Sequence, residues 1–107
     1  ISRDPQFGPL IAFGLGGIYV EVLKDVTFRI APITAREADE MIGEIRGAPL
    51  LRGVRGERPS DLNAVRDALL RVSQLVKEFP EIVELDVNPL VVHATGVVAL
   101  DVRLVVQ

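Results

Sequence analysis

Apolar and polar residues alternate along two runs near the C-terminal end of the chain, at about 82–91 and 97–106. Successive side chains of a strand point to opposite faces, so each run is predicted to be a strand with one apolar face. In the first run one face is predicted to carry Val83, Leu85 and Val87, and the other Glu84, Asp86 and Asn88. In the second run the core-facing residues are predicted to be Val98, Leu100, Val102 and Leu104.

The segment between the runs, His93-Ala94-Thr95-Gly96, is predicted to be the turn of a hairpin, because glycine readily adopts a positive φ. A four-residue turn fixes the register of the two strands. Asn88 then lies opposite Asp101, and Asp86 lies opposite Arg103. A two-residue turn would change the register and separate these pairs.

This pairing suggests a site for a hard cation. Directly opposed residues have Cβ atoms about 4.5–5.5 Å apart. The amide oxygen of Asn88 and the carboxylate of Asp101 can therefore share one Mg²⁺, whose other ligands are usually water and phosphate. A second interpretation is a solvated polar face with a cross-strand ion pair between Asp86 and Arg103. The spacing alone favours this second interpretation.

Upstream of the hairpin the pattern predicts two more strands. Phe7–Phe13 is continuously apolar and is predicted to be a buried strand, and Val26–Ala31 alternates as a strand does. Residues 18–22 fit either a strand or a helical turn. Residues 1–6 are predicted to be a loop or a linker.

The first of two predicted helices starts at a capping box, with Thr34 as N-cap and Glu37 three residues later. Its apolar residues recur at helical spacing: Ala38, Met41, Ile42 and Ile45. Gly47 is predicted to end this helix. Residues 47–59 are rich in glycine and proline and are predicted to form a loop with an apolar patch.

The second helix is predicted to have Ser60 as its N-cap and to end before Pro80. Its apolar stripe consists of Leu62, Val65, Leu69, Val72, Val76 and Phe79. Strands thus gather at both ends of the chain with helices between them. This order predicts an α+β fold: one domain, residues 1–107, with a mixed or antiparallel sheet and two main helices on one face.

Composition narrows the functional classes. The chain has 107 residues, with 49% hydrophobic and 25% charged residues, which is typical of one globular domain. A net charge of −3 without a basic run argues against nucleic-acid binding, and the absence of cysteine excludes disulfides and thiolate metal sites. No apolar stretch reaches the roughly 20 residues of a membrane span, and no signal peptide is visible, so the cytoplasm is the expected compartment. The chain begins without methionine, which suggests a fragment of a longer protein.

Other residues have the chemistry to bind phosphate. The Gly14–Gly17 turn can bring backbone N–H groups close to a phosphate, although a tight turn between packed elements explains it as well. Arg29 lies on the polar side of its strand and can clamp a phosphate or simply face solvent. The same two interpretations apply to three arginines of the 47–59 loop: Arg52, Arg55 and Arg58. His93, at the predicted turn, is expected to be exposed and is assigned no catalytic role.

Several motifs together resemble the ATP-grasp domain of ADP-forming acyl-CoA (acetyl-CoA) synthetases and, more distantly, the β subunit of succinyl-CoA synthetase. The matching stretches are Asp4–Pro9, Phe13–Glu21, Phe28–Pro32 and Glu84–Leu90. They cover nearly the whole chain, in order and at compatible spacings. The resemblance implies the C-terminal lobe of an ATP-grasp domain. The enzyme family couples the hydrolysis of ATP to ADP with the interconversion of acyl-CoA, through acyl phosphate and phosphohistidine intermediates.

The resemblance also implies roles for individual residues. Asn88 and Asp101 match the positions that hold the Mg²⁺ of the nucleotide. Asp86 matches the acidic residue expected near the phosphohistidine or behind the metal ligands, and is the catalytic candidate. Arg29, Gly16 and Gly17 fall where groups near the phosphates are expected.

The remaining ATP-grasp lobe, the phosphorylated histidine, and the CoA-binding and ligase domains are expected outside this chain. The isolated chain is therefore expected to fold but not to turn over ATP, and exposed apolar surface makes self-association plausible. One alternative is a nucleotide-binding regulatory module fused to a protein acetyltransferase. Another is a purely structural α+β interaction domain, with a solvated polar strand face.

Overall fold

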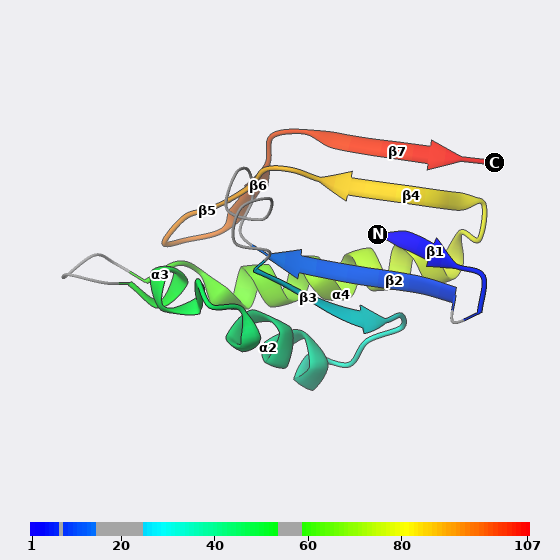
Figure 1. Cartoon of the computed structure of the whole chain (residues 1–107). Coiled ribbons are helices and arrows are strands. Elements are labelled where there is room, and N and C mark those ends of the chain that lie inside the picture. Colours follow the sequence, from blue (N-terminus) through cyan, green and yellow to red (C-terminus); the bar gives the residue numbers. More distant parts are fainter. Residues whose placement is uncertain (7, 15–24, 54–58) are drawn as a thin grey trace.

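The computed structural model describes residues 1–6, 8–14, 25–53 and 59–107 (Figure 1). The main sheet has the strand order β3-β2-β1-β4-β7, and the pairings among these strands are antiparallel. A separate two-stranded sheet pairs β5 with β6. The strands are β1 (Ser2–Asp4), β2 (Gly8–Gly14), β3 (Val26–Ile30), β4 (Ile82–Val87), β5 (Leu90–Val92), β6 (Val97–Ala99) and β7 (Val102–Val106). The helices of the described part are α2 (Ala35–Glu44), α3 (Ala48–Arg52) and α4 (Leu62–Glu78).

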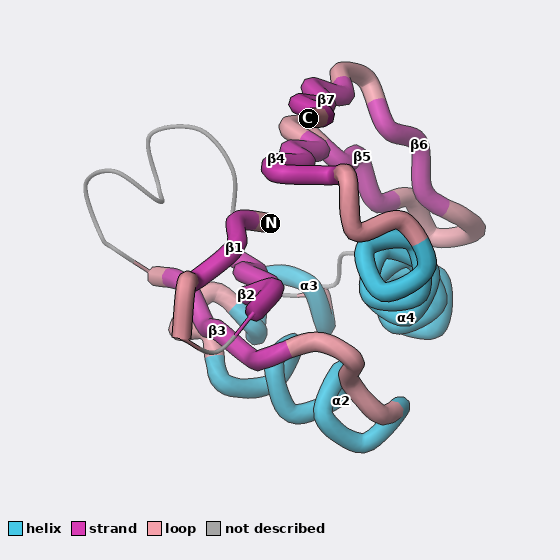
Figure 2. The backbone as a smooth tube through the Cα atoms, turned by 90° about the vertical axis from the view of Figure 1, so that its right-hand side faces the viewer, coloured by secondary structure: helices cyan, strands magenta, loops and turns pink. Residues whose placement is uncertain are grey.

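The helices lie on one face of the main sheet, which confirms the predicted α+β class (Figure 2). α2 packs against β3 and α4, and α4 packs against β2. The core between the two layers consists of Ile11, Ala31, Ile33, Ala38, Met41, Ile42, Val65, Leu69, Val76, Ile82 and Leu85. Removal of this apolar surface from water is the main driving force for folding.

The first residues form a strand and not the predicted loop or linker. β1 lies in the middle of the sheet, between β2 and β4. The Arg3 guanidinium donates hydrogen bonds to the carbonyls of Ile82, Val76 and Phe79 at 2.5, 3.0 and 3.4 Å. These bonds tie β1 to the end of α4 and the start of β4. Because the partners lie 73–79 residues away in the sequence, a local pattern could not reveal them.

The two main helices begin close to their predicted positions. Thr34 is the N-cap of α2 and forms the predicted capping box with Glu37. α4 begins one residue later than predicted, since its N-cap is Asp61 and not Ser60. The predicted loop 47–59 contains the short helix α3, whose start is favoured by a proline in its first turn. No helix in the described part of the chain is long and apolar enough to cross a membrane.

Four apolar side chains on β6, on β7 and between these strands are exposed, so the prediction that these four face the core is wrong. The exposed fractions are 53% for Val102, 51% for Leu104, 47% for Val98 and 65% for Leu100. Leu104 pairs with Leu85 of β4, which is 5% exposed and belongs to the core. β7 is the edge strand of the sheet, and the described helices do not cover it.

Asp61 fixes the hairpin turn to the start of α4. Its two carboxylate oxygens accept the N–H groups of Ala64 at 3.0 Å and of Gly96 at 2.8 Å. Its own N–H donates to the carbonyl of His93 at 2.8 Å. Gly96 has a φ of 86°, as expected for the predicted turn. The hydrogen bond from Gly96, followed by that from Ala64, lowers the pKa of the Asp61 carboxyl.

The substitution Asp61→Ala is expected to lower the melting temperature by several degrees near neutral pH, because it removes a helix cap and the link to the turn. A carboxyl whose pKa is lower in the folded state than in the unfolded state stabilises the fold at a pH above its unfolded-state pKa. This contribution is lost as the pH falls through the folded-state pKa. The difference in melting temperature should therefore shrink below about pH 4. Thermal unfolding followed by circular dichroism measures it. Asp67→Ala, on the exposed face of α4, is the control, and a pH-independent difference would contradict the assignment.

Candidate functional site

The predicted register of the hairpin is confirmed. Asp86 pairs with Arg103 in β4 and β7, and β5 pairs with β6 in the same register. The N–H of Asn88 donates to the carbonyl of Asp101 at 3.1 Å, so these residues lie opposite each other. They fall between the two sheets, because the hairpin is interrupted there and contributes to both sheets instead of one.

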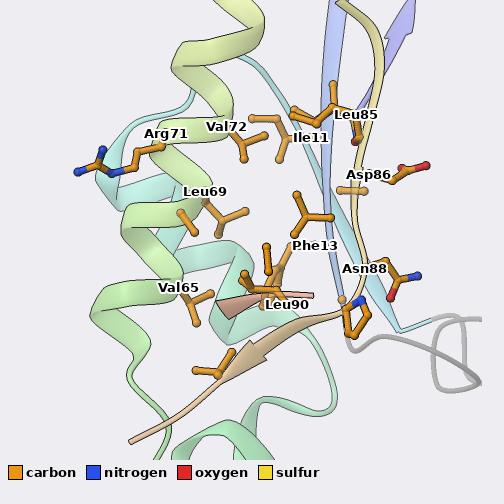
Figure 3. A pocket seen from close by; sticks show the side chains of 18 of the residues that line it. Ile11, Phe13, Val65, Leu69, Arg71, Val72, Leu85, Asp86, Asn88 and Leu90 are labelled. Atoms are coloured by element: carbon orange, nitrogen blue, oxygen red, sulfur yellow. The ribbon is translucent and has the colours of Figure 1, made fainter. Parts of the chain in front are cut away.

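The polar side chains of the hairpin gather in one pocket. Its volume is about 190 Å³, and it is lined by Asp86, Asn88, Asp101 and Arg103. In Figure 3, Asp86 and Asn88 point away from α4, whereas Leu85 lies on the side of the core. The four residues of the pocket are exposed, so a ligand in solution can reach their oxygen and nitrogen atoms.

The donor atoms of this pocket suit magnesium. Mg²⁺ prefers oxygen ligands and is usually bound by one or two carboxylates together with water and phosphate. The pocket offers the carboxylates of Asp86 and Asp101 and the amide oxygen of Asn88. The described residues contain no group of three or more His, Cys, Asp or Glu side chains placed to hold a metal. Phosphate and water oxygens would therefore have to complete the coordination.

The predicted cross-strand ion pair between Asp86 and Arg103 is present, but its charged atoms are far apart. The guanidinium of Arg103 lies 4.0 Å from a carboxylate oxygen of Asp86 and 3.8 Å from one of Glu84. The Arg103 side chain is 69% exposed. Exposed pairs at such distances contribute little to stability. The ion pair therefore contributes little to the stability of the hairpin.

A second pocket lies on the other side of β4 (Figure 3). Its volume is about 690 Å³, and apolar side chains of α4, β2, β4 and β5 form most of its lining. Ile11, Leu69 and Leu85 belong both to this lining and to the hydrophobic core. Its charged lining residues, Arg71 and Asp86, point away from its centre. The polar chemistry of the hairpin is thus on the opposite side of β4 from the core.

Arg29 does not lie near the polar pocket. It is on β3, at the opposite edge of the sheet from β7. Its guanidinium hydrogen-bonds the carboxylate of Glu44 and lies 3.7 Å from that of Glu40, both on α2. The hydrogen bond to Glu44 is the main cause that raises the pKa of Arg29. Arg29 joins β3 to α2 in this structure, and its contact with a phosphate stays a prediction.

The other sequence candidates are divided between the described and undescribed parts of the chain. Gly16 and Gly17 lie outside the described residues, as do Arg55 and Arg58. Arg52 ends α3, and His93 is exposed at the turn, as predicted. The sequence predicted Arg103 only as the ion-pair partner of Asp86, whereas in the structure it also lines the polar pocket. The register contained the signal, since Arg103 lies opposite Asp86 and two residues after Asp101.

Comparison with known proteins identifies the family. Residues 1–106 match the family model described as an ATP-grasp domain. The chain belongs to this family. This ATP-grasp sequence is 57% identical over 105 residues to acetate–CoA ligase (ADP-forming) I of Archaeoglobus fulgidus. It is 52% identical over 103 residues to the β subunit of acetate–CoA ligase (ADP-forming) I of Pyrococcus furiosus. These matches cover 98% and 96% of the chain, but 15% and 44% of the two relatives.

A solved structure supports the same relationship. The ATP-grasp fold described here resembles a dinucleotide-forming acetyl-coenzyme A synthetase 1 of Ca. Korarchaeum cryptofilum, solved with coenzyme A and Mg-AMPPCP. The TM-score is 0.95 at 43% sequence identity, and the match covers 99% of this chain and 50% of that chain. The chain thus spans half or less of the length of the relatives named here.

Proposed function

We propose that this chain is the later lobe of an ATP-grasp domain in an ADP-forming acyl-CoA synthetase, and that it binds the magnesium and phosphates of ATP. The observation that supports this most directly is the convergence of Asp86, Asn88 and Asp101 on one exposed pocket. The ligase names of its relatives support the reaction class. The mostly apolar pocket behind β4 offers few groups for phosphate chemistry.

In this proposal Asn88 and Asp101 hold the Mg²⁺, and Asp86 stands beside them. A bound Mg²⁺ would offset negative charge on the phosphates. Asp86 is proposed to orient the metal ligands or the histidine that exchanges the phosphoryl group. That histidine is proposed to come from outside this chain, since His93 is exposed at the turn and its backbone carbonyl accepts a hydrogen bond from Asp61.

We further propose that the missing lobe and the CoA-binding part of the enzyme lie against this chain. In the Ca. Korarchaeum cryptofilum synthetase with Mg-AMPPCP, a phosphohistidine segment points towards the nucleotide-binding site of that protein. A similar segment could approach the polar pocket here, because its four lining residues are exposed. The exposed apolar side chains of β6 and β7 are candidates for the surface that such neighbours cover.

Acyl-CoA synthesis by the full-length protein tests the proposed function. With acetate, coenzyme A and Mg-ATP it is expected to form acetyl-CoA, ADP and phosphate in equal amounts, and a panel of other short acids would reveal its preferred acyl group. The 107-residue chain alone is expected to show no turnover. Nucleotide binding without acyl-CoA formation from any acid would contradict the ligase function and favour the regulatory alternative.

A further inference from the structure

Arg103 shares the polar pocket with the proposed metal ligands. Of the four described residues that line the pocket, it alone carries a positive charge. It comes two residues after Asp101, and both side chains line the pocket. It also lies directly opposite Asp86. The backbone thus directs a guanidinium into the same small space as two carboxylates and an amide.

The guanidinium of Arg103 forms loose ion pairs but no hydrogen bond with the described part of the protein. The nearest carboxylate oxygens, from Glu84 and Asp86, are 3.8 and 4.0 Å away, beyond hydrogen-bond distance. Arg29 provides a contrast, since it is 21% exposed and hydrogen-bonds Glu44. Arg29 already has a structural partner, whereas the planar fork of Arg103 remains available for a ligand with two oxygen atoms.

Electrostatics indicate which ligand would suit this arrangement. A guanidinium and a magnesium ion in one pocket repel each other, because both are cations. An anion that contacts both cations is attracted to each of them, and these two attractions outweigh the repulsion between the cations. A phosphate group has enough oxygen atoms to reach the metal on one side and the guanidinium on the other. The pocket therefore suits a metal-bound polyphosphate better than a cation alone.

We propose that Arg103 binds a phosphate oxygen of the nucleotide directly, beside the metal and independently of it. This inference rests on the proposed function, because the phosphate is that of the Mg-nucleotide assigned to the same pocket. Arg103 thereby acts on the phosphate itself, whereas Asn88 and Asp101 act on it through the metal. The two contributions are separable, because removal of magnesium eliminates one and leaves the other.

The test measures the affinity of the full-length protein for AMPPCP by calorimetry, with magnesium and with magnesium removed by a chelator. Arg103→Gln is expected to weaken binding on the order of tenfold in both conditions, because a hydrogen-bonded charged contact is lost. Arg103→Lys, which keeps the charge but not the fork, is expected to fall between the wild type and Arg103→Gln. Asp101→Ala is expected to weaken binding only when magnesium is present. Arg36→Gln is the matched control, because Arg36 is 89% exposed on α2 and pairs with Glu40, away from the pocket.

The outcomes separate this proposal from the proposed function. If Arg103→Gln behaves like Arg36→Gln with and without magnesium, the direct phosphate contact is wrong, even if Asp101→Ala responds as expected. If Arg103→Gln weakens binding only with magnesium, Arg103 acts through the metal ligands and the proposal is also overturned. If Asp101→Ala makes no difference in either condition, the proposed metal site fails, while loss of affinity in Arg103→Gln would still support the phosphate contact.

Discussion

The substitution Asp101→Ala is expected to abolish phosphorylation of histidine by ATP in the full-length protein. Asp101 and Asn88 lie opposite each other in the polar pocket, and Asp101 supplies the negative charge of this pair. Mutation of a residue that hydrogen-bonds a metal ligand typically lowers metal affinity or activity about 10–100-fold. Loss of a metal ligand itself should therefore lower the activity at least about a hundredfold. Asn88→Ala is expected to act in the same direction with a smaller effect, because the amide carries no charge.

The measurement follows acid-labile label after incubation of the protein with magnesium and γ-labelled ATP. Asp67→Ala is a suitable control, because this aspartate lies on the exposed face of α4 and pairs with Arg71. Circular dichroism should show intact folding in each variant. Unchanged labelling in both Asp101→Ala and Asn88→Ala would mean that the metal binds elsewhere. The polar face of the hairpin would then be a solvated surface and not a metal site. Absence of label in the wild type, with ATP still bound, would argue against the phosphohistidine route.

The pocket could be predicted from the sequence because one local feature controls it. The four-residue turn sets the register, and the register brings Asn88 to Asp101 and Asp86 to Arg103. The pairing stays constant along the hairpin until the irregularity between Ile82 and Glu84. The hydrogen bond from Gly96 to Asp61 further holds this geometry, and it could not be predicted, because it joins residues 35 positions apart.

Other parts of the structure depend on long-range packing, and the sequence did not reveal them. β1 has three residues, too few for a periodic signal, and is held by neighbouring strands and by the contacts of Arg3. Arg29 and Arg103 both lie on the polar side of a strand, yet only Arg29 has a helix beside it with carboxylates in reach. The position of α2 therefore gives Arg29 its carboxylate partners. The local sequence patterns around Arg29 and Arg103 do not show this difference.

The exposed face of β7 shows the same limit. Alternation of apolar residues correctly predicted a strand with one apolar side, but alternation cannot show whether a helix covers that side. Leu85 and Leu104 are cross-strand partners in adjacent strands, and they are 5% and 51% exposed. They form a matched pair, since the residue type and the strand pairing are shared and the burial differs.

The substitution Leu85→Ala is therefore expected to destabilise the chain much more than Leu104→Ala. Removal of a buried leucine side chain costs about 2–5 kcal/mol, because apolar contacts are lost and a cavity remains. This is a large part of the roughly 5–15 kcal/mol that stabilises a typical domain. Leu104→Ala is expected to cost about 1 kcal/mol or less, as for a substitution on an exposed strand face. Urea denaturation of the purified chain measures both values, and equal costs would contradict the observed burial.

The same pair reports on the surroundings of this lobe in the full-length protein. If another part of the protein covers the apolar side of β7, Leu104 becomes buried there, and Leu104→Ala should cost several times more than in the chain alone. The cost of Leu85→Ala should change little, because that side chain is already buried in the core of this chain. A cost for Leu104→Ala that is equally small in both proteins would mean that this face of β7 stays exposed, and that the neighbouring parts of the enzyme contact the lobe elsewhere.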